Sequence, residues 1–376
     1  MLAAVALAVG VVHAQSDDDD EDLDYYPIVP SGNQVRFGLH FVGGPKISFG
    51  QLGYVPTNVS PGDTETPGNR SYNDGLVSLN ARLDHDGNTI IDGFTNTWSY
   101  SNASQATPGG DIAFHAYSAT SLGGEHQAKA GTAAGWELQM SRNFGRIAHK
   151  IEFSIVAGFT FSDMNAKTTG TVPARLVTVT DVYSLNGQPV PTAPYTAPST
   201  TTVTVYDNNG NPVIGSDGSI TTTTRDNTTL LSSLPISRTT TTGTTDVNGR
   251  WQIKGAYYTF RLGPAFLIPL SERLKINIGA GVGLAYVGSD YLAEEDIVLP
   301  DTETTVTTQA VSARSAWLPV VYADADAEYW LTERTGFYLG ASAQKSGSYD
   351  QTLDGRTARV DLGSTYGITS GITLRF

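Results

Sequence analysis

TARVDLGSTYGITSGITLRF, residues 357–376, is the stretch of sequence that decides the fold. Because side chains alternate across a β-strand, its apolar residues fall on one face and its polar residues on the other. The apolar face holds Val360, Leu362, Tyr366, Ile368, Ile372, Leu374 and Phe376. The polar face holds Arg359, Asp361, Thr365, Thr369, Thr373 and Arg375. This pattern, longer than the usual ~5–6 residues of a strand, is typical of a strand between lipid and a polar lumen.

The last eight residues, TSGITLRF, resemble the carboxyl-terminal assembly signal of bacterial outer-membrane β-barrel proteins. The resemblance rests on a polar residue at Thr369, a glycine at Gly371, an apolar residue at Leu374 and a terminal aromatic residue at Phe376. It covers this final segment and indicates no particular subfamily. It implies an integral outer-membrane barrel of a diderm bacterium, with outer-membrane lipid and the barrel assembly machinery as partners.

Composition predicts an all-β protein and excludes several functions. The chain of 376 residues is 39% hydrophobic with 40 glycines, and it is poor in the Leu and Ile of helical cores. It has no cysteine, which excludes disulfides, thiolate metal ligands and cysteine nucleophiles. A formal net charge of −14 argues against a nucleic-acid partner, because phosphates require a basic surface. No apolar run reaches the ~18–20 residues of a spanning helix, so a membrane role requires a closed barrel.

The amino-terminal residues predict export. Residues 2–12 form an apolar run of signal-peptide length, and Val12-His13-Ala14 resembles a cleavage site, so residues 1–14 are predicted to be a signal peptide. No Lys or Arg follows Met1, which would fit a start codon further upstream. Residues 15–33 contain the acidic run SDDDDEDLD, whose like charges repel. We expect these residues to form a solvated periplasmic tether.

Alternating segments predict a transmembrane antiparallel up-and-down β-barrel over residues 34–376. The segments are residues 34–42, 77–83, 89–100, 134–141, 150–161, 250–268, 274–286, 317–331, 337–343 and 357–376. They amount to about ten strands, with eight or twelve as alternatives because residues 85–131 fit more than one assignment. An even number of strands places both termini in the periplasm.

Residues 163–249 are predicted to leave the wall as a large Thr-rich extracellular insertion. VYSLNGQPV at residues 182–190 and VYDNNGNPV at residues 205–213 share one frame, and each contains an Asn-Gly turn signal. We expect two similar β-hairpins on the cell surface, where they could bind an extracellular ligand. A disordered Thr-rich linker is the alternative.

Charged residues at inward positions predict a salt-bridged lumen. The candidates are Arg36, Glu152, Arg261, Asp324, Asp326, Glu328, Arg359 and Asp361. Neighbouring carboxylates can shift one another's pKa and serve acid–base chemistry. In a narrow barrel, however, inward acids pair with inward bases, and hydrogen-bonded pairs offset their desolvation. We therefore expect a charged plug and no catalytic residue.

Two motifs suggest a metal or a cofactor, and both fail on spacing. DHDGN at residues 84–88 has the spacing of the first ligands of a calcium loop, but Thr89 and Thr95 stand where glycine and glutamate are required. INIGAGVGL at residues 276–284 resembles a dinucleotide-binding turn, but Leu284 occupies the third glycine position. We expect no metal and no cofactor.

The sequence favours a non-enzymatic barrel that displays surface loops for adhesion, envelope stability or ligand capture. A narrow pore or hydrophobic-ligand channel is the alternative, and an exported soluble β-sandwich binding protein is the second alternative. The size and the repeat of the insertion favour display, because a pore needs no hairpins outside the membrane. A strand number near ten is similar to that of the outer-membrane protease family, but its acidic pair and Asp–His pair have no convincing counterpart here.

Overall fold

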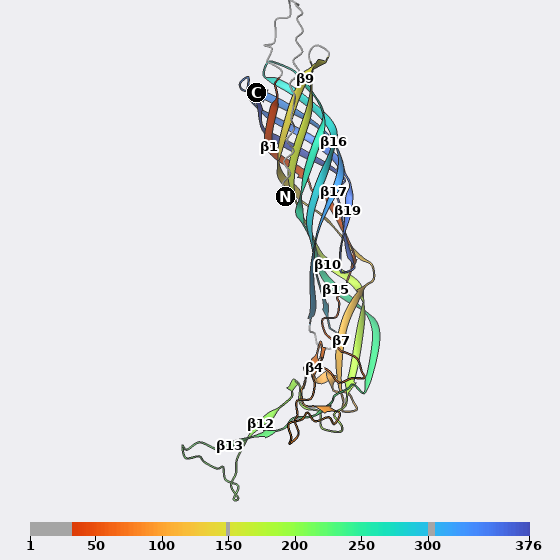
Figure 1. The fold of residues 1–376 in the computed structure, drawn as a ribbon, viewed down its shortest axis with the longest axis vertical. Coiled ribbons are helices and arrows are strands. Elements are labelled where there is room, and N and C mark those ends of the chain that lie inside the picture. Colours follow the sequence, from red (N-terminus) through yellow and green to blue (C-terminus); the bar gives the residue numbers. More distant parts are fainter. Residues whose placement is uncertain (1–31, 148–150, 300–304) are drawn as a thin grey trace, which may run out of the picture.

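The computed structural model describes residues 32–147, 151–299 and 305–376. The predicted signal peptide and nearly all of the predicted tether lie outside these ranges. Antiparallel strands dominate the described residues, which confirms the all-β prediction, and the only regular helix among them is the short η1 (Ala103–Gln105). No helix in the described ranges is long and apolar enough to cross a membrane. The molecule is elongated, with β1, β9 and β16 near one end and β4, β12 and β13 near the other (Figure 1).

Eight strands pair in a cycle at one end of the molecule. In pairing order they are β1 (Gln34–Gly43), β9 (Thr132–Ile147), β10 (Ile151–Tyr183), β15 (Ser237–Pro269), β16 (Leu274–Val298), β17 (Thr305–Trp330), β18 (Thr335–Ser346) and β21 (Ser364–Arg375). β21 then pairs back with β1, with Gln34 opposite Arg375. Each pairing is antiparallel, so neither the first nor the last strand is left as an edge.

Two of the expected wall segments lie outside this cycle, so it has eight strands, one of the alternatives, instead of ten. Residues 77–83 and 89–100 supply only the short strands β4 (Gly75–Val77), β5 (Phe94–Thr95) and β6 (Trp98–Tyr100), which belong to small sheets at the far end. Trp98 and Tyr100 are buried there in a core of their own. Their aromatic rings therefore pack against protein, not lipid.

The strands of the cycle continue beyond it in two groups. β10, β15, β16 and β17 run on without interruption, and β10 and β15 reach 33 residues each. The other four break. Beyond the breaks lie β2 (Lys46–Leu52) and β19 (Ser348–Leu353), which come after β1 and β18 in the chain, and β8 (Gly124–Lys129) and β20 (Arg356–Asp361), which come before β9 and β21; these four pair in the order β19-β20-β2-β8. Residues 163–249 thus begin and end as continuous strands and do not leave the wall at once, because β10 and β15 pair as far as Val182 and Ser237.

The breaks reverse which residues face inward. In β21 the buried residues are Thr365, Thr369 and Thr373, whereas before the break Val360 and Leu362 are buried. Gly363, with a φ of +36°, lies where the buried positions change from even-numbered to odd-numbered residues. The prediction that Val360 and Leu362 share a face with the outward residues of β21 is therefore wrong. Arg359 and Asp361 consequently point outward instead of into the lumen.

The interior changes from polar to apolar along the same strands. On β15, Arg261 is buried and Leu262 is 56% exposed, whereas Trp251 and Ile253 are fully buried and Lys254 is exposed. The buried apolar residues of the second part form one core between the sheet β19-β20-β2-β8 and the continuing strands. We call this part the neck. Its core includes Ile47, Phe49, Trp251, Ile253, Val287, Tyr291, Ala358 and Val360.

A row of outward aromatic residues lies where the exterior changes from apolar to polar. Trp136 is opposite Phe161, Phe161 is opposite Tyr258, Tyr258 is opposite Tyr286, and Tyr286 is opposite Trp317. The ring centroids are 5.3 Å apart in the pair of Phe161 and Tyr258 and 4.9 Å apart in the pair of Tyr286 and Trp317. We call these five residues the aromatic belt. Such rows are typical of the interface between a membrane and water.

The far end of the molecule, which we call the distal head, has a second apolar core. It is built by β7 (Ile112–Ser121), which pairs with the end of β10, and by the sheet of β11 (Tyr195–Thr196), β6, β4 and β3 (Arg70–Tyr72). β14 (Leu231–Ser232) pairs with β5. β12 (Thr200–Thr204) and β13 (Thr222–Asp226) form a two-stranded arm that projects from the head (Figure 1).

The two sequence repeats form different turns, contrary to the expectation of similar hairpins. In the first, Asn186 and Gly187 both have positive φ, at 51° and 75°. In the second, only Gly210 has positive φ, and the carboxylate of Asp207 accepts hydrogen bonds from the amides of Asn209 and Asn211. The first copy has Ser184 at the matching position, whose hydroxyl oxygen accepts a bond from the Asn186 amide. The two turns therefore differ in the side chain that accepts the amide hydrogen bonds, a serine hydroxyl in the first copy and an aspartate carboxylate in the second.

The neck core encloses an ion pair between Glu295 and Arg356, both fully buried, with Nε and Oε2 2.9 Å apart. The Glu295 carboxylate also accepts hydrogen bonds from the amides of Gly53 and Tyr54 and from Trp251 Nε1. It thereby ties β15, β16 and β20 to the chain after β2. Removing one charge of such a pair leaves the other buried and uncompensated.

We predict that Glu295→Gln lowers the free energy of unfolding by about 3–5 kcal/mol. The matched control is Glu294→Gln at the neighbouring position, where the pair with Arg250 is partly exposed and the loss should stay below about 1 kcal/mol. Urea unfolding in detergent micelles, followed by tryptophan fluorescence, measures both. Equal losses in the two variants would contradict the assigned role of Glu295.

Candidate functional site

A cluster of charged side chains fills the inside of the eight-strand cycle. Arg36 forms ion pairs with Glu328 and, at 3.1 Å, with Asp326. Arg261 pairs with Glu137 at 3.1 Å and lies 3.7 Å from Asp324. We call this set the lumen cluster: Arg36, Glu137, Arg261, Asp324, Asp326 and Glu328. It brings together five of the eight residues predicted from the sequence.

The pairs of the lumen cluster cross the interior instead of joining neighbouring strands. Arg36 is on β1 and its carboxylate partners are on β17, whereas the neighbours of β1 are β9 and β21. Arg261 on β15 likewise reaches Glu137 on β9, past the intervening β10. The Tyr338 hydroxyl donates to Glu137 at 2.8 Å, also across the interior. These contacts tie strands together that are not neighbours in the wall.

Further polar groups donate hydrogen bonds to the buried carboxylates. Asn277 Nδ2 donates to Asp326 Oδ2 at 2.9 Å, and Trp330 Nε1 donates to Glu328 Oε2 at 3.2 Å. The guanidinium of Arg261 lies over the Tyr322 ring, 5.0 Å from its centroid. Hydrogen bonds and ring contacts of this kind offset the cost of removing charges from water.

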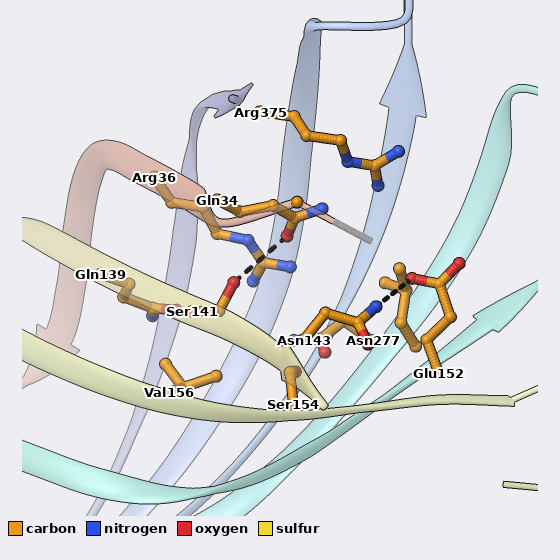
Figure 2. Close-up of a pocket in the computed structure, with 12 residues that line it drawn as sticks. Gln34, Arg36, Gln139, Ser141, Asn143, Glu152, Ser154, Val156, Asn277 and Arg375 are labelled. Carbon is orange, nitrogen blue, oxygen red and sulfur yellow. Dashed lines mark hydrogen bonds between the residues drawn. The ribbon is translucent and has the colours of Figure 1, made fainter. Parts of the chain in front are cut away.

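Two cavities inside the cycle are small. Side chains of β1, β9, β10, β16 and β21 converge on a cavity of about 20 Å³ at the end where β1 begins and β21 ends (Figure 2). Asn143 Nδ2 donates there to Glu152 Oε2 at 2.8 Å. A second cavity beside Glu137 and Arg261 has about 10 Å³. Since one water needs about 10–15 Å³, each cavity has room for about one water and neither is a conduit.

The other three predicted lumen residues lie outside the cluster. Glu152 lines the cavity shown in Figure 2, and its Oε1 atom lies 3.8 Å from Lys275 Nζ. Arg359 and Asp361 are exposed on the outer face of β20, where Arg359 donates to the Ser348 hydroxyl at 3.0 Å. Sequence reasoning left Glu137 out of the site, although its alternation with Trp136 and Leu138 already placed it on the inward face.

The residues of the predicted assembly signal divide between the two faces of β21. Thr369 is buried and points inward, while Leu374 and Phe376 are 42% and 69% exposed on the outside. Gly371 pairs with Gly38 of β1, and a Cβ at Gly371 would overlap the carbonyl oxygen of Phe37. Glycine at this position therefore permits the close approach of the last strand to the first.

The distal head contains a second buried polar cluster. The fully buried Asp181 accepts hydrogen bonds from Nε and Nη2 of Arg238, both at 2.6 Å, and from the Tyr72 hydroxyl at 2.6 Å. Arg238 also donates to the carbonyl oxygens of Pro61 and Gly62, so the cluster fastens this loop to β10. Burial and the neighbouring Asp181 carboxylate raise the pKa of Tyr72.

The calcium-like run of residues 84–88 forms a turn. The Asp84 carboxylate accepts hydrogen bonds from the amides of Asp86 and Asn88. The Asn88 amide is the main cause of a lowered pKa at Asp84. Within residues 32–147, 151–299 and 305–376, no group of three or more His, Asp or Glu side chains could hold a metal ion.

Comparison with known proteins identifies no family. No protein-family model matches the chain, and no curated protein sequence matches it. Among solved structures, Ail, the attachment invasion locus protein of Yersinia pestis, has a TM-score of 0.23 and 8% identity over 91% of this chain and 99% of that chain. A Pseudomonas aeruginosa FadL homologue has a TM-score of 0.20 and 9% identity over 92% and 90% of the two chains. The P. putida toluene transporter TodX has a TM-score of 0.16 and 9% identity over 92% and 91%.

These similar structures are bacterial outer-membrane β-barrel proteins. At such TM-scores the likeness carries no argument about this chain. The fold described above rests on the observed strand pairings, and the function proposed below rests on the distribution of side chains.

We predict that Arg36→Met lowers the free energy of unfolding by about 3–5 kcal/mol, because Asp326 and Glu328 lose their buried partner. The matched control is Arg359→Met, which removes the same type of side chain from the outer face and should cost less than about 1 kcal/mol. Urea unfolding in micelles measures both. A loss at Arg359 as large as that at Arg36 would contradict the assignment of inner and outer faces.

We also predict that the head loses stability at alkaline pH. The pKa of Tyr72 is raised above its ordinary 10.0 in the folded chain. Stability is therefore unaffected below about pH 10 and falls as the pH rises further, because only the unfolded chain then releases the proton. Tyr72→Phe should weaken this decline. Unfolding curves near pH 8 and pH 11, from the fluorescence of Trp98 in a background where phenylalanine replaces the other four tryptophans, test this, and an equal loss of stability with and without Tyr72→Phe would disprove it.

Proposed function

We propose that this chain is an integral outer-membrane protein in which the eight-strand cycle is a closed, membrane-spanning β-barrel. The apolar exterior around the cycle carries the argument. On β16 the outward residues from Ile276 to Tyr286 are apolar, a span that matches the ~9–11 residues of a membrane-crossing strand. Beyond Tyr286 the outward positions turn polar with Asp290 and Glu294. Lipid on the outside of the cycle and water outside the neck account for this change.

The same exterior argues against a soluble β-sandwich. Phe37, Leu39 and Phe41 on β1 and Phe260 and Leu262 on β15 are each between 42% and 56% exposed. In water they would contribute to an apolar surface far larger than the few hundred Å² that soluble monomers present. Burial in lipid removes this cost.

We propose that the barrel displays the neck and the distal head at the cell surface, where the head binds an extracellular ligand. The filled lumen supports display over a pore, since ion pairs cross the interior and the two cavities beside them have volumes of about 20 and 10 Å³. The head has its own apolar core and an exposed arm, which anchoring alone does not require. No enzymatic activity is proposed, because the charged side chains of the lumen cluster pair with one another across the interior.

The proposed orientation places the barrel end with Gln34 and Arg375 in the periplasm and the head outside. Figure 1 locates the carboxyl terminus at the barrel end away from the head. Residues 1–14 as a signal peptide and residues 15–33 as a periplasmic tether fit this orientation. Leu374 and Phe376, exposed on the last strand, are the proposed contacts of the assembly machinery.

We predict that a protease added to intact cells cleaves the arm within residues 205–221 and leaves a membrane-bound barrel fragment. These residues are mostly exposed at the tip of the arm, where backbone is open to proteases. Immunoblots of cells before and after permeabilisation measure this. Cleavage that requires permeabilised cells would contradict surface display.

Planar-bilayer recordings test the filled lumen. We predict that the refolded full chain inserts without discrete conductance steps, because the lumen cluster blocks the interior. The control is the double variant Arg36→Ala with Arg261→Ala, which removes the cross-barrel cations and should admit ions if it folds. Regular channel steps in the unmodified protein would support the pore alternative instead.

A further inference from the structure

A wide apolar groove runs over the outside of β16, β17, β18, β21 and β1, with a volume of about 890 Å³. Its floor is made of small residues in cross-strand register. Ala280 is opposite Ala323, which is opposite Ala343, and Ala325 is opposite Ala341. Larger side chains stand beside this floor and are well exposed, namely Phe41, Ile278, Tyr366 and Ile368.

A basic patch lies on the head side of the groove. Lys345 is outward and exposed on β18, two residues beyond Ala343 of the groove floor, which is about 7 Å along a strand. Lys46 and Lys129 are directly opposite each other on the outer face of β2 and β8. Arg359 lies on the same face of the adjoining β20. We call these four residues the basic patch.

The charges of the basic patch are incompletely balanced. Like charges directly opposite each other on neighbouring strands are destabilising, as for Lys46 and Lys129. Asp350, Asp361 and Glu125 share this face, with Asp361 opposite Lys46 and Asp350 opposite Arg359, so the four basic residues outnumber the acidic ones by one in a chain whose formal net charge is −14. Among the described residues, none of the four basic side chains forms an ion pair within 4.0 Å. The patch thus presents cations to a ligand.

We propose that the groove and the basic patch together bind one anionic lipid of the outer leaflet. This inference rests on the proposed membrane location. The acyl chain lies in the groove, because the groove belongs to the apolar exterior of the wall. The phosphate of the head group contacts Lys345 and its neighbours, because Phe41 and Tyr366 are the last outward apolar residues before the chain turns polar. Basic clusters at this level of a membrane protein recognise anionic lipid head groups.

The positive charge of the basic patch favours a lipid over a second copy of this chain as the occupant of the groove. A symmetric dimer that covers the groove brings the same patch of both copies together. The two basic patches would then repel each other at the edge of the interface. A phosphate-bearing lipid instead neutralises the patch while it fills the groove.

Native mass spectrometry of the full chain in dodecylmaltoside micelles, titrated with lipid A, tests the proposal. We expect one retained lipid in the unmodified protein. Lys345→Glu and Ala323→Leu should each weaken retention about tenfold or more, by charge reversal and by filling the groove. The matched controls are Lys254→Glu on the outer face of β15 and Ala157→Leu on the outer face of β10, both away from the groove. These should retain the lipid as the unmodified protein does.

Three results would overturn the proposal. The first is equal retention in all four variants. The second is stabilisation of the protein by inorganic phosphate as strong as that by lipid A, which would indicate a site for a free anion. The third is a dimer that Ala323→Leu dissociates, which would indicate a second copy in the groove. A protein that inserts into bilayers but retains no lipid would disprove this inference alone, whereas one that stays soluble without detergent would disprove the membrane location itself.

Discussion

The structure depends on a reversal of polarity between the inside and the outside along continuous strands. β15 buries Arg261 and exposes Leu262 at one end, and it buries Trp251 and exposes Lys254 at the other. In the proposed membrane location, a single chain segment meets two solvents, lipid around the eight-strand cycle and water around the neck. The aromatic belt lies at the transition between them. For the proposed membrane barrel, this distribution of side chains determines which part of each strand lies in the lipid.

The reversal has a geometric consequence for the four strands that break. A strand that keeps its alternation presents the same parity of residues inward throughout, and a shift of one residue exchanges its faces. Gly363 provides such a shift between β20 and β21. Through the barrel and the neck, the long strands β10, β15, β16 and β17 bury residues of the same parity, so on them only the residue types change. The two groups enclose a charged interior in the barrel and an apolar core in the neck.

Much of the wall could be predicted from the sequence, because alternation is a local signal. The strands β1, β9, β15, β16 and β21 fall where alternating residues 34–42, 134–141, 250–268, 274–286 and the end of the chain placed them. The shift at Gly363 could not be predicted, since Val360 and Tyr366 differ by an even number of positions and would share a face of an unbroken strand. Residues 77–83 alternate as well, but Leu79 and Leu83 are 53% and 60% exposed in the distal head.

The lumen cluster was predictable only in part. The alternation of side chains along each strand shows which residues face inward, and this identified the charged residues Arg36, Arg261, Asp324, Asp326 and Glu328. Which of these residues pair with each other could not be predicted, because the pairs cross the interior between strands that are far apart in sequence and not adjacent in the wall. Arg359 and Asp361 were misplaced for the same reason as Val360, since the parity shift turns them outward.

The most direct test of the polarity reversal is a scan of single reporter cysteines, which the cysteine-free chain permits. Fluorophores placed at the outward positions Leu262 and Leu284, and separately at Lys254 and Asp290, would be quenched by nitroxide lipids and by aqueous iodide. The account predicts that the first pair responds to the lipid quencher and the second pair to iodide. Uniform quenching by iodide at all four positions would contradict a membrane-spanning barrel.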